Sequence, residues 1–145
     1  YKNIRICLAF GEFFKKNDER VLTEIIFKAL SKNEINLIDD GSAIRRYIYI
    51  EDAVKMILNI LTKGKEQTYN LGGKEELSIF ELANIISKLT ETKIVKGSKN
   101  NKLNNSPNFA GVDIEKYEKE FGEVYFTSIE DGLKKCIEWA KLINN

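Results

Sequence analysis

The residues best suited to chemistry lie in one short segment, where two arginines precede alternating tyrosines and isoleucines. In a strand, alternation places Arg45 with Tyr47 and Tyr49 on one face and Arg46 on the other. A guanidinium held on a strand beside aromatic rings suits a diphosphate, because its N–H fork matches phosphate oxygens and its plane stacks on rings. Spacing alone favours the alternative, an arginine solvated at a strand edge.

Other charged residues offer weaker candidates. Four lysines near one polar stretch are possible phosphate contacts, although lysine-rich segments are usually only solvated. They are Lys93, Lys96, Lys99 and Lys102. Four acidic residues fit no calcium loop, and turn and helix-start roles explain them better than a metal site does. They are Asp39, Asp40, Glu51 and Asp52.

Several kinds of chemistry are excluded or disfavoured. The chain has no histidine, which removes Ser/His and Cys/His catalysis and histidine-ligated zinc. The hydroxyls of Ser78 and Ser128 are expected to cap helices. Neither G-x-x-x-x-G-K-[ST] nor G-x-G-x-x-G occurs, and Gly72 and Gly73 follow a strand without further glycines. We therefore expect no dinucleotide site within these residues.

The chain has 145 residues, 43% of them hydrophobic, which suits one domain over residues 1–145. A formal net charge of +1 gives no field that would attract nucleic acid or a membrane surface. Cys7 and Cys136 are far apart, so reduced thiols are expected. We find no membrane span or signal peptide pattern and expect a cytoplasmic location. Because the chain starts at Tyr1 directly before a strand-like run, we expect a longer natural protein.

Predicted strands and helices alternate along the chain, which indicates a mixed α/β fold. Strands are predicted over 4–8, 35–38, 46–50, 68–71 and 93–95, and the second and third are expected to form a hairpin. Five helices are predicted over about 18–30, 51–64, 78–89, 113–122 and from 128 onward.

Particular residues are expected to start and end these helices. Asp18 is predicted to cap the first helix, and Gly64 to take the left-handed position after the second. Ser78 and Glu81 form a capping box for the third. The stretch 97–108 is rich in Lys, Asn and Ser, so an exposed, mobile loop is predicted there.

Longer motifs resemble one enzyme family. Residues 39–52 read Asp-Asp-Gly-Ser-Ala-Ile-Arg-Arg-Tyr-Ile-Tyr-Ile-Glu-Asp, and residues 69–73 read Tyr-Asn-Leu-Gly-Gly. With Asp131-Gly132-Leu133 before Trp139, these motifs resemble the carboxyl-terminal, substrate-binding part of an extended short-chain dehydrogenase/reductase, the nucleotide-sugar epimerase/dehydratase family. Residues 1–11 resemble the last strands of the dinucleotide-binding domain. The resemblance implies a small mixed sheet, about five helices and an absent dinucleotide-binding half.

The resemblance also assigns residues. Arg45 matches the arginine that contacts the substrate diphosphate in such enzymes, which reverses the preference stated above. Arg20 matches a substrate-approaching position of decarboxylase-like members, although an arginine near a helix start is also an ordinary surface residue. Tyr47 either lines the pocket or packs in the core. Asp52 matches a family aspartate whose role helix capping explains.

Three departures from the family pattern stand out. Leu8 replaces a substrate-contacting asparagine, and Glu12 replaces a proline. The second phosphate-binding arginine has no match, since residues 104–107 read Asn-Asn-Ser-Pro and only nearby lysines offer a substitute. No tyrosine has a lysine four positions later, so the catalytic Y-x-x-x-K pair is not within this sequence.

The resemblance implies the substrate-binding portion of an NAD(P)-dependent nucleotide-sugar epimerase or dehydratase, with a decarboxylase as the other option. The full-length enzyme would bind NAD or NADP and form a homodimer through the other half, while these residues alone would bind no cofactor and would not catalyse. The expected partner is a nucleotide diphosphate-sugar. The alternative is a non-catalytic module that binds a nucleotide-sugar or a protein and lacks the cofactor half.

Overall fold

The computed structural model describes residues 1–97 and 107–144. Its strands are β1 (Asn3–Ile6), β2 (Leu8–Phe10), β3 (Glu34–Asn36), β4 (Ile44–Tyr49), β5 (Thr68–Leu71), β6 (Glu76–Ser78), β7 (Lys93–Val95) and β8 (Phe109–Ala110). Its helices are α1 (Val21–Lys32), α2 (Ile50–Lys63), α3 (Ile79–Thr90), α4 (Glu115–Phe121) and α5 (Ile129–Asn144). The predicted mixed α/β class and five helices are confirmed for these residues.

Within residues 1–97 and 107–144, the strands form three small groups. β1 pairs with β5, β2 with β4, and β3 with β7, all in parallel, whereas β6 joins β4 antiparallel. β8 also pairs with β4, in parallel. The extended segment from β1 to β2 therefore contributes strands to two sheets. β1 and β2 are separated only by Cys7, yet β1 pairs with β5 and β2 pairs with β4.

The predicted hairpin between residues 35–38 and 46–50 is wrong. β3 pairs with β7 and not with β4, and the connecting residues bond elsewhere. The amide of Gly97 donates to the Asp39 carbonyl and that of Phe80 to the Gly41 carbonyl. Gly41 has a positive φ of 70°, which glycine adopts without steric cost. The turn therefore leads β3 and β4 to different partners.

Two of the predicted helix ends are also wrong. Arg20, and not Asp18, occupies the N-cap of α1, and Asp18 accepts from the Arg20 amide instead. Gly64 does follow α2, but its φ is −62°, outside the left-handed region. The capping box of Ser78 and Glu81 is confirmed at α3, and Ser128 accepts from the Asp131 amide at the start of α5.

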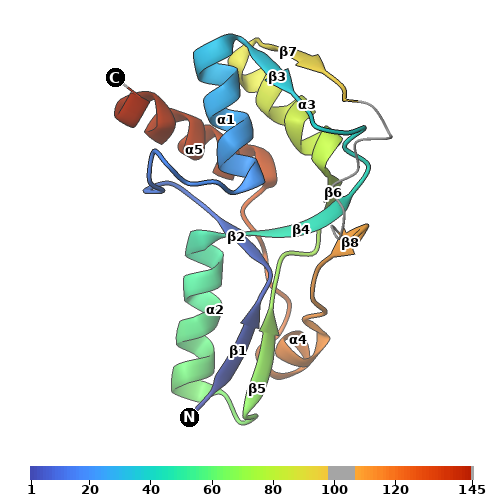
Figure 1. Cartoon of the computed structure of the whole chain (residues 1–145). Coiled ribbons are helices and arrows are strands. Elements are labelled where there is room, and N and C mark those ends of the chain that lie inside the picture. Colours follow the sequence, from blue (N-terminus) through green and yellow to red (C-terminus); the bar gives the residue numbers. More distant parts are fainter. Residues whose placement is uncertain (98–106, 145) are drawn as a thin grey trace.

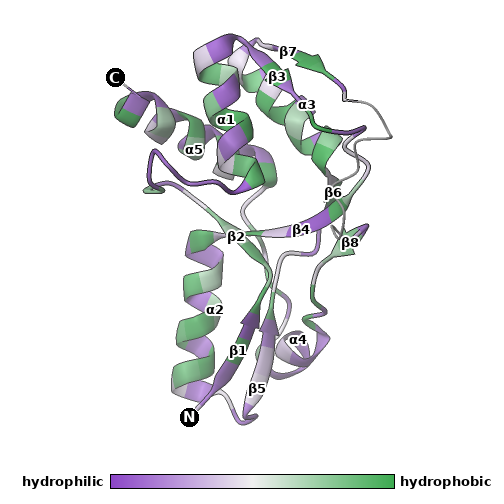
Figure 2. Ribbon diagram, viewed as in Figure 1, coloured by the Kyte–Doolittle hydropathy of each residue, from purple (hydrophilic) through white to green (hydrophobic). Residues whose placement is uncertain are grey.

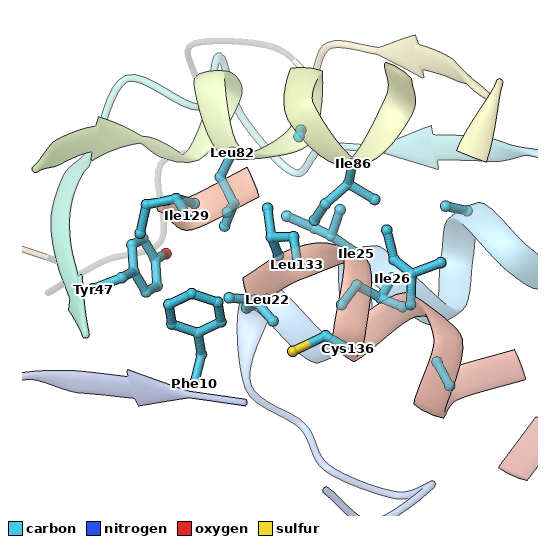
Figure 3. Packing of buried hydrophobic residues seen from close by; sticks show 14 of the residues in the cluster. Phe10, Leu22, Ile25, Ile26, Tyr47, Leu82, Ile86, Ile129, Leu133 and Cys136 are labelled. Atoms are coloured by element: carbon cyan, nitrogen blue, oxygen red, sulfur yellow. The ribbon is translucent and has the colours of Figure 1, made fainter. Parts of the chain in front are cut away.

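The buried apolar residues of the described chain form two cores. Figure 1 shows the elements around them, α1, α3 and α5 on one side of β4 and α2, β1, β5 and α4 on the other. The larger core lies among α1, α3, α5, β2 and β4, and Figure 3 shows its centre. The smaller core lies among α2, α4, β1 and β5. β4 separates the two cores and contributes to both, because Tyr47 and Tyr49 on one face belong to the larger core and Ile48 on the other face belongs to the smaller.

Two further predictions concern particular segments. Most of the predicted loop over 97–108 lies outside the described residues. No described helix combines the length and the apolar character that crossing a membrane requires.

Candidate functional site

A cavity of about 620 Å³ opens beside the larger core. Its walls come from the β1–β2 segment, the start of α1, the residues after β3 and the inner face of β4. Arg20, Arg45 and Tyr47, the three site residues expected from the sequence, all line it. Segments far apart in the sequence therefore bring these residues to one place.

Arg45 is held at the cavity by backbone oxygens. Its Nη1 donates to the carbonyls of Ile44 at 2.7 Å and Pro107 at 3.0 Å. Arg45 is half-buried. It lies on β4, and the pairing of β4 with β6 and β8 fixes its backbone. An ordered, positively charged group thus lies at the cavity wall, where an anion is favoured.

Arg20 reaches the same cavity from the N-cap of α1. Its Nη2 lies 2.5 Å from the Asp18 carboxylate and its Nη1 donates to the Ala9 carbonyl at 3.1 Å. The hydrogen bonds from Arg20 lower the pKa of the Asp18 carboxyl. The Arg20 side chain is 60% exposed, so it stands at the mouth of the cavity while Asp18 orients it.

Tyr47 is almost fully buried, and its ring meets Phe10 edge-on with centroids 6.1 Å apart. Burial raises the pKa of the Tyr47 hydroxyl to about 12. Among the residues that the structure describes, that hydroxyl has no hydrogen-bond partner, whereas those of Tyr49 and Tyr69 each bond a glutamate. Figure 3 shows Tyr47 beside Phe10 in the core, so the residue both packs and lines the cavity.

Sequence reasoning missed Thr23 as a cavity residue. It lies on α1, is 2% exposed and lines the cavity. Its hydroxyl makes no hydrogen bond within the described part of the chain, where no fully buried side-chain oxygen or nitrogen lacks a partner, so the hydroxyl itself is in contact with the cavity. The sequence could have indicated Thr23, because it lies between the apolar helix positions Leu22 and Ile25. Burying a polar side chain costs free energy unless it has a polar partner or a function.

Other candidates lie elsewhere. Asp52 is outside the cavity, and its Oδ2 accepts from the Thr127 amide at 2.7 Å. The ammonium of Lys96 lies 3.5 Å from the centroid of the Phe80 ring. Lys99, Lys102 and residues 104–106 fall outside the described residues. Leu8 lines the cavity, whereas Glu12 accepts from the Tyr49 hydroxyl.

The arrangement suits an elongated anion with an apolar part. Two guanidinium groups flank a cavity whose remaining walls are largely apolar, including Phe10, Leu22 and Leu37. Charge-assisted hydrogen bonds are stronger where water is partly excluded. The lining also includes the ammonium of Lys28 and the carboxylates of Glu19, Glu24 and Asp39, so its charge is mixed. Among the described residues, the Thr23 and Tyr47 hydroxyls make no hydrogen bond, and the cavity holds no obvious nucleophile with an adjacent base.

Comparisons with known proteins agree on one group of enzymes. The model of the "NAD dependent epimerase/dehydratase family" matches residues 1–72. An Arabidopsis thaliana trifunctional UDP-glucose 4,6-dehydratase/UDP-4-keto-6-deoxy-D-glucose 3,5-epimerase/UDP-4-keto-L-rhamnose-reductase is 30% identical over 125 residues, 83% of this chain and 18% of that protein. The Danio rerio UDP-glucuronic acid decarboxylase 1 is 27% identical over 93% of this chain and 32% of its own length.

Solved structures show the same fold. The dTDP-glucose 4,6-dehydratase of Bacillus anthracis, in complex with NAD, superposes with a TM-score of 0.81 at 22% identity. The superposition covers 96% of this chain and 44% of that one. The UDP-glucuronic acid 4-epimerase of Bacillus cereus, in complex with UDP-glucuronic acid and NAD, gives 0.78 at 22% identity and covers 97% and 45%. The chain thus spans less than half of each of these four relatives.

Proposed function

Because the chain belongs to the NAD dependent epimerase/dehydratase family, we propose that its cavity binds the nucleotide diphosphate-sugar substrate of such an enzyme. The observation that carries the proposal is the convergence of Arg20, Arg45 and Tyr47 on one cavity of about 620 Å³. A volume of this size suits a small-molecule ligand. Curated relatives are named for dehydration, epimerisation or decarboxylation of nucleotide-sugars, which supports the same substrate class.

Each residue has a proposed part. Arg45 binds diphosphate oxygens, and its carbonyl contacts to Ile44 and Pro107 keep the guanidinium in place before the ligand arrives. Arg20 adds a second positive charge at the mouth. The Tyr47 hydroxyl, with no partner in the described residues, is available to a polar group of the ligand. The role of this chain is therefore to hold and orient the substrate.

The residues of this chain do not fit an NAD site. A dinucleotide cradle needs glycines whose backbone a phosphate can approach. Here Gly73 packs against its own chain, since a Cβ at that position would lie 2.0 Å from the Tyr47 carbonyl oxygen. Gly11 likewise faces the Ile50 side chain. We propose that another part of the enzyme binds NAD or NADP, and we derive no chemical step through it.

Calorimetry with UDP-glucose and dTDP-glucose tests the proposal. We expect the Arg45→Ala variant to bind about 10- to 100-fold more weakly, because a charge-assisted contact to phosphate is lost. Arg45→Lys keeps the charge without the fork and should fall between the two. The matched control is Arg5→Ala, since Arg5 is exposed on β1 and does not line the cavity. Unchanged binding by Arg45→Ala, or no binding by the unaltered chain, contradicts the proposal.

The second candidate is a binding module without catalysis. It is favoured by Leu8, an apolar residue lining the cavity where the resembled enzymes have a substrate-contacting asparagine. The intact mass of the protein made by its own cell separates the two functions. A mass well above 16.7 kDa, together with turnover of a nucleotide-sugar, supports the enzyme. A cytoplasmic location and a homodimer stay predictions from the sequence.

A further inference from the structure

One wall of the cavity is an irregular segment, residues 11–20, which we call the β2–α1 segment. It contributes Gly11, Phe14, Glu19 and Arg20 to the lining. Residues 15–20 read Lys-Lys-Asn-Asp-Glu-Arg, and Figure 2 shows hydrophilic colour along most of the segment. Such a sequence buries little apolar area. Contacts with the rest of the molecule must therefore hold this wall in place.

The backbone of the segment is strained at Phe13. Its φ is 66°, a region that bulky side chains rarely occupy. The other described non-glycine residues with positive φ, Asn33 and Glu91, follow α1 and α3, where a left-handed residue commonly ends a helix. Phe13 ends no helix and is 75% exposed, so burial of its ring does not offset the strain. Strain of this kind persists where the surroundings impose it, and it is frequent at ligand-binding sites.

Trp139 of α5 makes the contacts that hold Phe13. The two rings lie with centroids 4.9 Å apart and planes tilted by 59°. The indole Nε1 of Trp139 also donates to the Phe14 carbonyl at 2.9 Å. Ring contact and hydrogen bond together fix two consecutive residues of the β2–α1 segment. Figure 1 shows α5 beside the segment between β2 and α1.

The segment is also tied at its two ends. The Arg20 guanidinium donates to the Ala9 carbonyl at 3.1 Å, which joins the residue before the segment's start to its last residue. Loops with close ends that pack through their own side chains are frequently functional. Phe14 is 7% exposed and lines the cavity, so the contact from Trp139 to Phe14 leads directly to the ligand site.

We propose that Trp139 is a positioning residue for the ligand cavity. It holds Phe13 in the strained conformation and thereby keeps the wall from Gly11 to Arg20 in place for a nucleotide-sugar. Trp139 itself is not among the described residues that line the cavity, so it acts through Phe13 and Phe14. Without this hold, Phe13 relaxes to a negative φ, which redirects the chain at Phe14 and lowers the fraction of molecules that can bind. This inference rests on the proposed function.

Trp139 is the one tryptophan of the chain, so its fluorescence reports on this contact. We expect UDP-glucose to change the emission of Trp139 with the same Kd that calorimetry gives. Quenching by acrylamide should fall by about twofold on binding, because the ligand orders the wall that Trp139 holds. A tryptophan that only packs against the core would show no response to a ligand that it does not touch.

Two variants separate positioning from folding. Trp139→Phe keeps a ring beside Phe13 but loses the indole N–H, and should weaken UDP-glucose binding by about 3- to 10-fold. Phe13→Ala keeps the strained Cβ but loses the ring contact, and should weaken binding similarly, whereas Phe13→Tyr should restore it. The matched control is Tyr125→Ala, since Tyr125 is also an exposed aromatic, at 88%, and lies outside the cavity lining. Circular dichroism checks that each variant folds.

Hydrogen exchange tests the hold on the segment without ligand. The Asp18 amide donates to the Lys15 carbonyl at 3.1 Å within the segment. Its exchange should be about tenfold faster in Trp139→Phe than in the unaltered chain. If Trp139→Phe binds UDP-glucose as the unaltered chain does, this inference is overturned while the proposed function stands. If the unaltered chain binds no nucleotide-sugar, the proposed function fails, and unchanged Asp18 exchange in Trp139→Phe then overturns the hold on the wall as well.

Discussion

The larger and smaller cores differ in how completely they are enclosed. The larger core has helices α1, α3 and α5 around it, and its central side chains, such as Ile26 and Leu133, are 0% exposed. The smaller core also has fully buried residues, such as Ile60 and Leu71, but its main helix carries an apolar stripe in solvent. The cavity adjoins the enclosed region, and the exposed apolar stripe of α2 belongs to the open one. This α2 stripe consists of Ile50, Val54, Leu58 and Leu61. The larger core is therefore closed by its own helices, whereas the smaller core leaves apolar side chains of its main helix in solvent.

The largest expected effect tests whether the larger core is closed and the α2 stripe open. Leu133→Ala leaves a void among α1, α3 and α5 and should lower the free energy of unfolding by about 2–5 kcal/mol. Leu58→Ala removes a side chain that is 55% exposed and should change it by about 0.5 kcal/mol or less. Urea unfolding followed by circular dichroism measures both. Similar losses for the two variants would mean that the stripe is already covered.

Alkaline pH should lower the free energy of unfolding through two buried groups of the larger core, Tyr47 and Cys136. Burial raises the pKa of Tyr47 from 10.0 and that of Cys136 from 9.0, each to about 12. The folded state therefore favours the neutral forms, so their contribution is complete below the ordinary pKa values and is lost as the pH rises toward 12. For Tyr47 the loss reaches about 2–3 kcal/mol, at 1.36 kcal/mol per unit.

The variant Tyr47→Phe removes this titration. Because the hydroxyl has no partner in the described residues, the variant should change the free energy of unfolding little at pH 7. Its unfolding free energy should fall less than that of the unaltered protein between pH 10 and 12. Tyr125→Phe is the control, because Tyr125 is 88% exposed and should not alter the alkaline loss. Identical pH profiles for Tyr47→Phe and the unaltered protein would contradict the assignment.

Asp52 joins the two regions. It lies in α2 with a side chain 4% exposed, and its Oδ2 accepts from the amide of Thr127, just before α5. Asp52→Ala leaves that amide without its acceptor and should cost about 1–3 kcal/mol. Asp52→Asn keeps an acceptor oxygen and should cost less. If Asp52→Ala unfolded at the same urea concentration as the unaltered protein, α2 would be held by its apolar contacts alone.

Local patterns in the sequence predicted local structure well. The helical repeat, the Ser78 capping box and the alternation on β4 depend on residues within a few positions of one another, so they could be identified directly. The hairpin prediction failed because sequence proximity is only a weak guide to strand pairing. β3 instead reaches β7, near residue 94, because α1 and α3 pack together and bring these strands side by side.

The site was only partly predictable for the same reason. Arg45 and Tyr47 share a strand face, which alternation indicates, but the approach of Arg20 to them depends on how α1 packs. Thr23 was missed because its role depends on a cavity that only the tertiary structure forms. The apolar positions of α2 were readable as a helical pattern, yet which of them are covered depends on the neighbours of the helix.

The smallest expected effect concerns the charged mouth of the cavity in the enclosed region. Asp18→Ala removes the pair with Arg20, whose side chain is 60% exposed, so the stability loss at pH 7 should be about 1 kcal/mol or less.

Hydrogen bonds from Arg20 lower the pKa of Asp18. The pair therefore contributes above the ordinary carboxyl pKa, and the contribution is lost as the pH falls through the lowered value. Thermal unfolding at pH 7 and pH 3 should show the difference between Asp18→Ala and the unaltered protein shrinking in acid. Lys119→Ala, which breaks an exposed pair with Glu115 on α4, is the control from the open region. If Asp18→Ala changed neither stability nor nucleotide-sugar binding, Arg20 would be oriented by the Ala9 carbonyl alone.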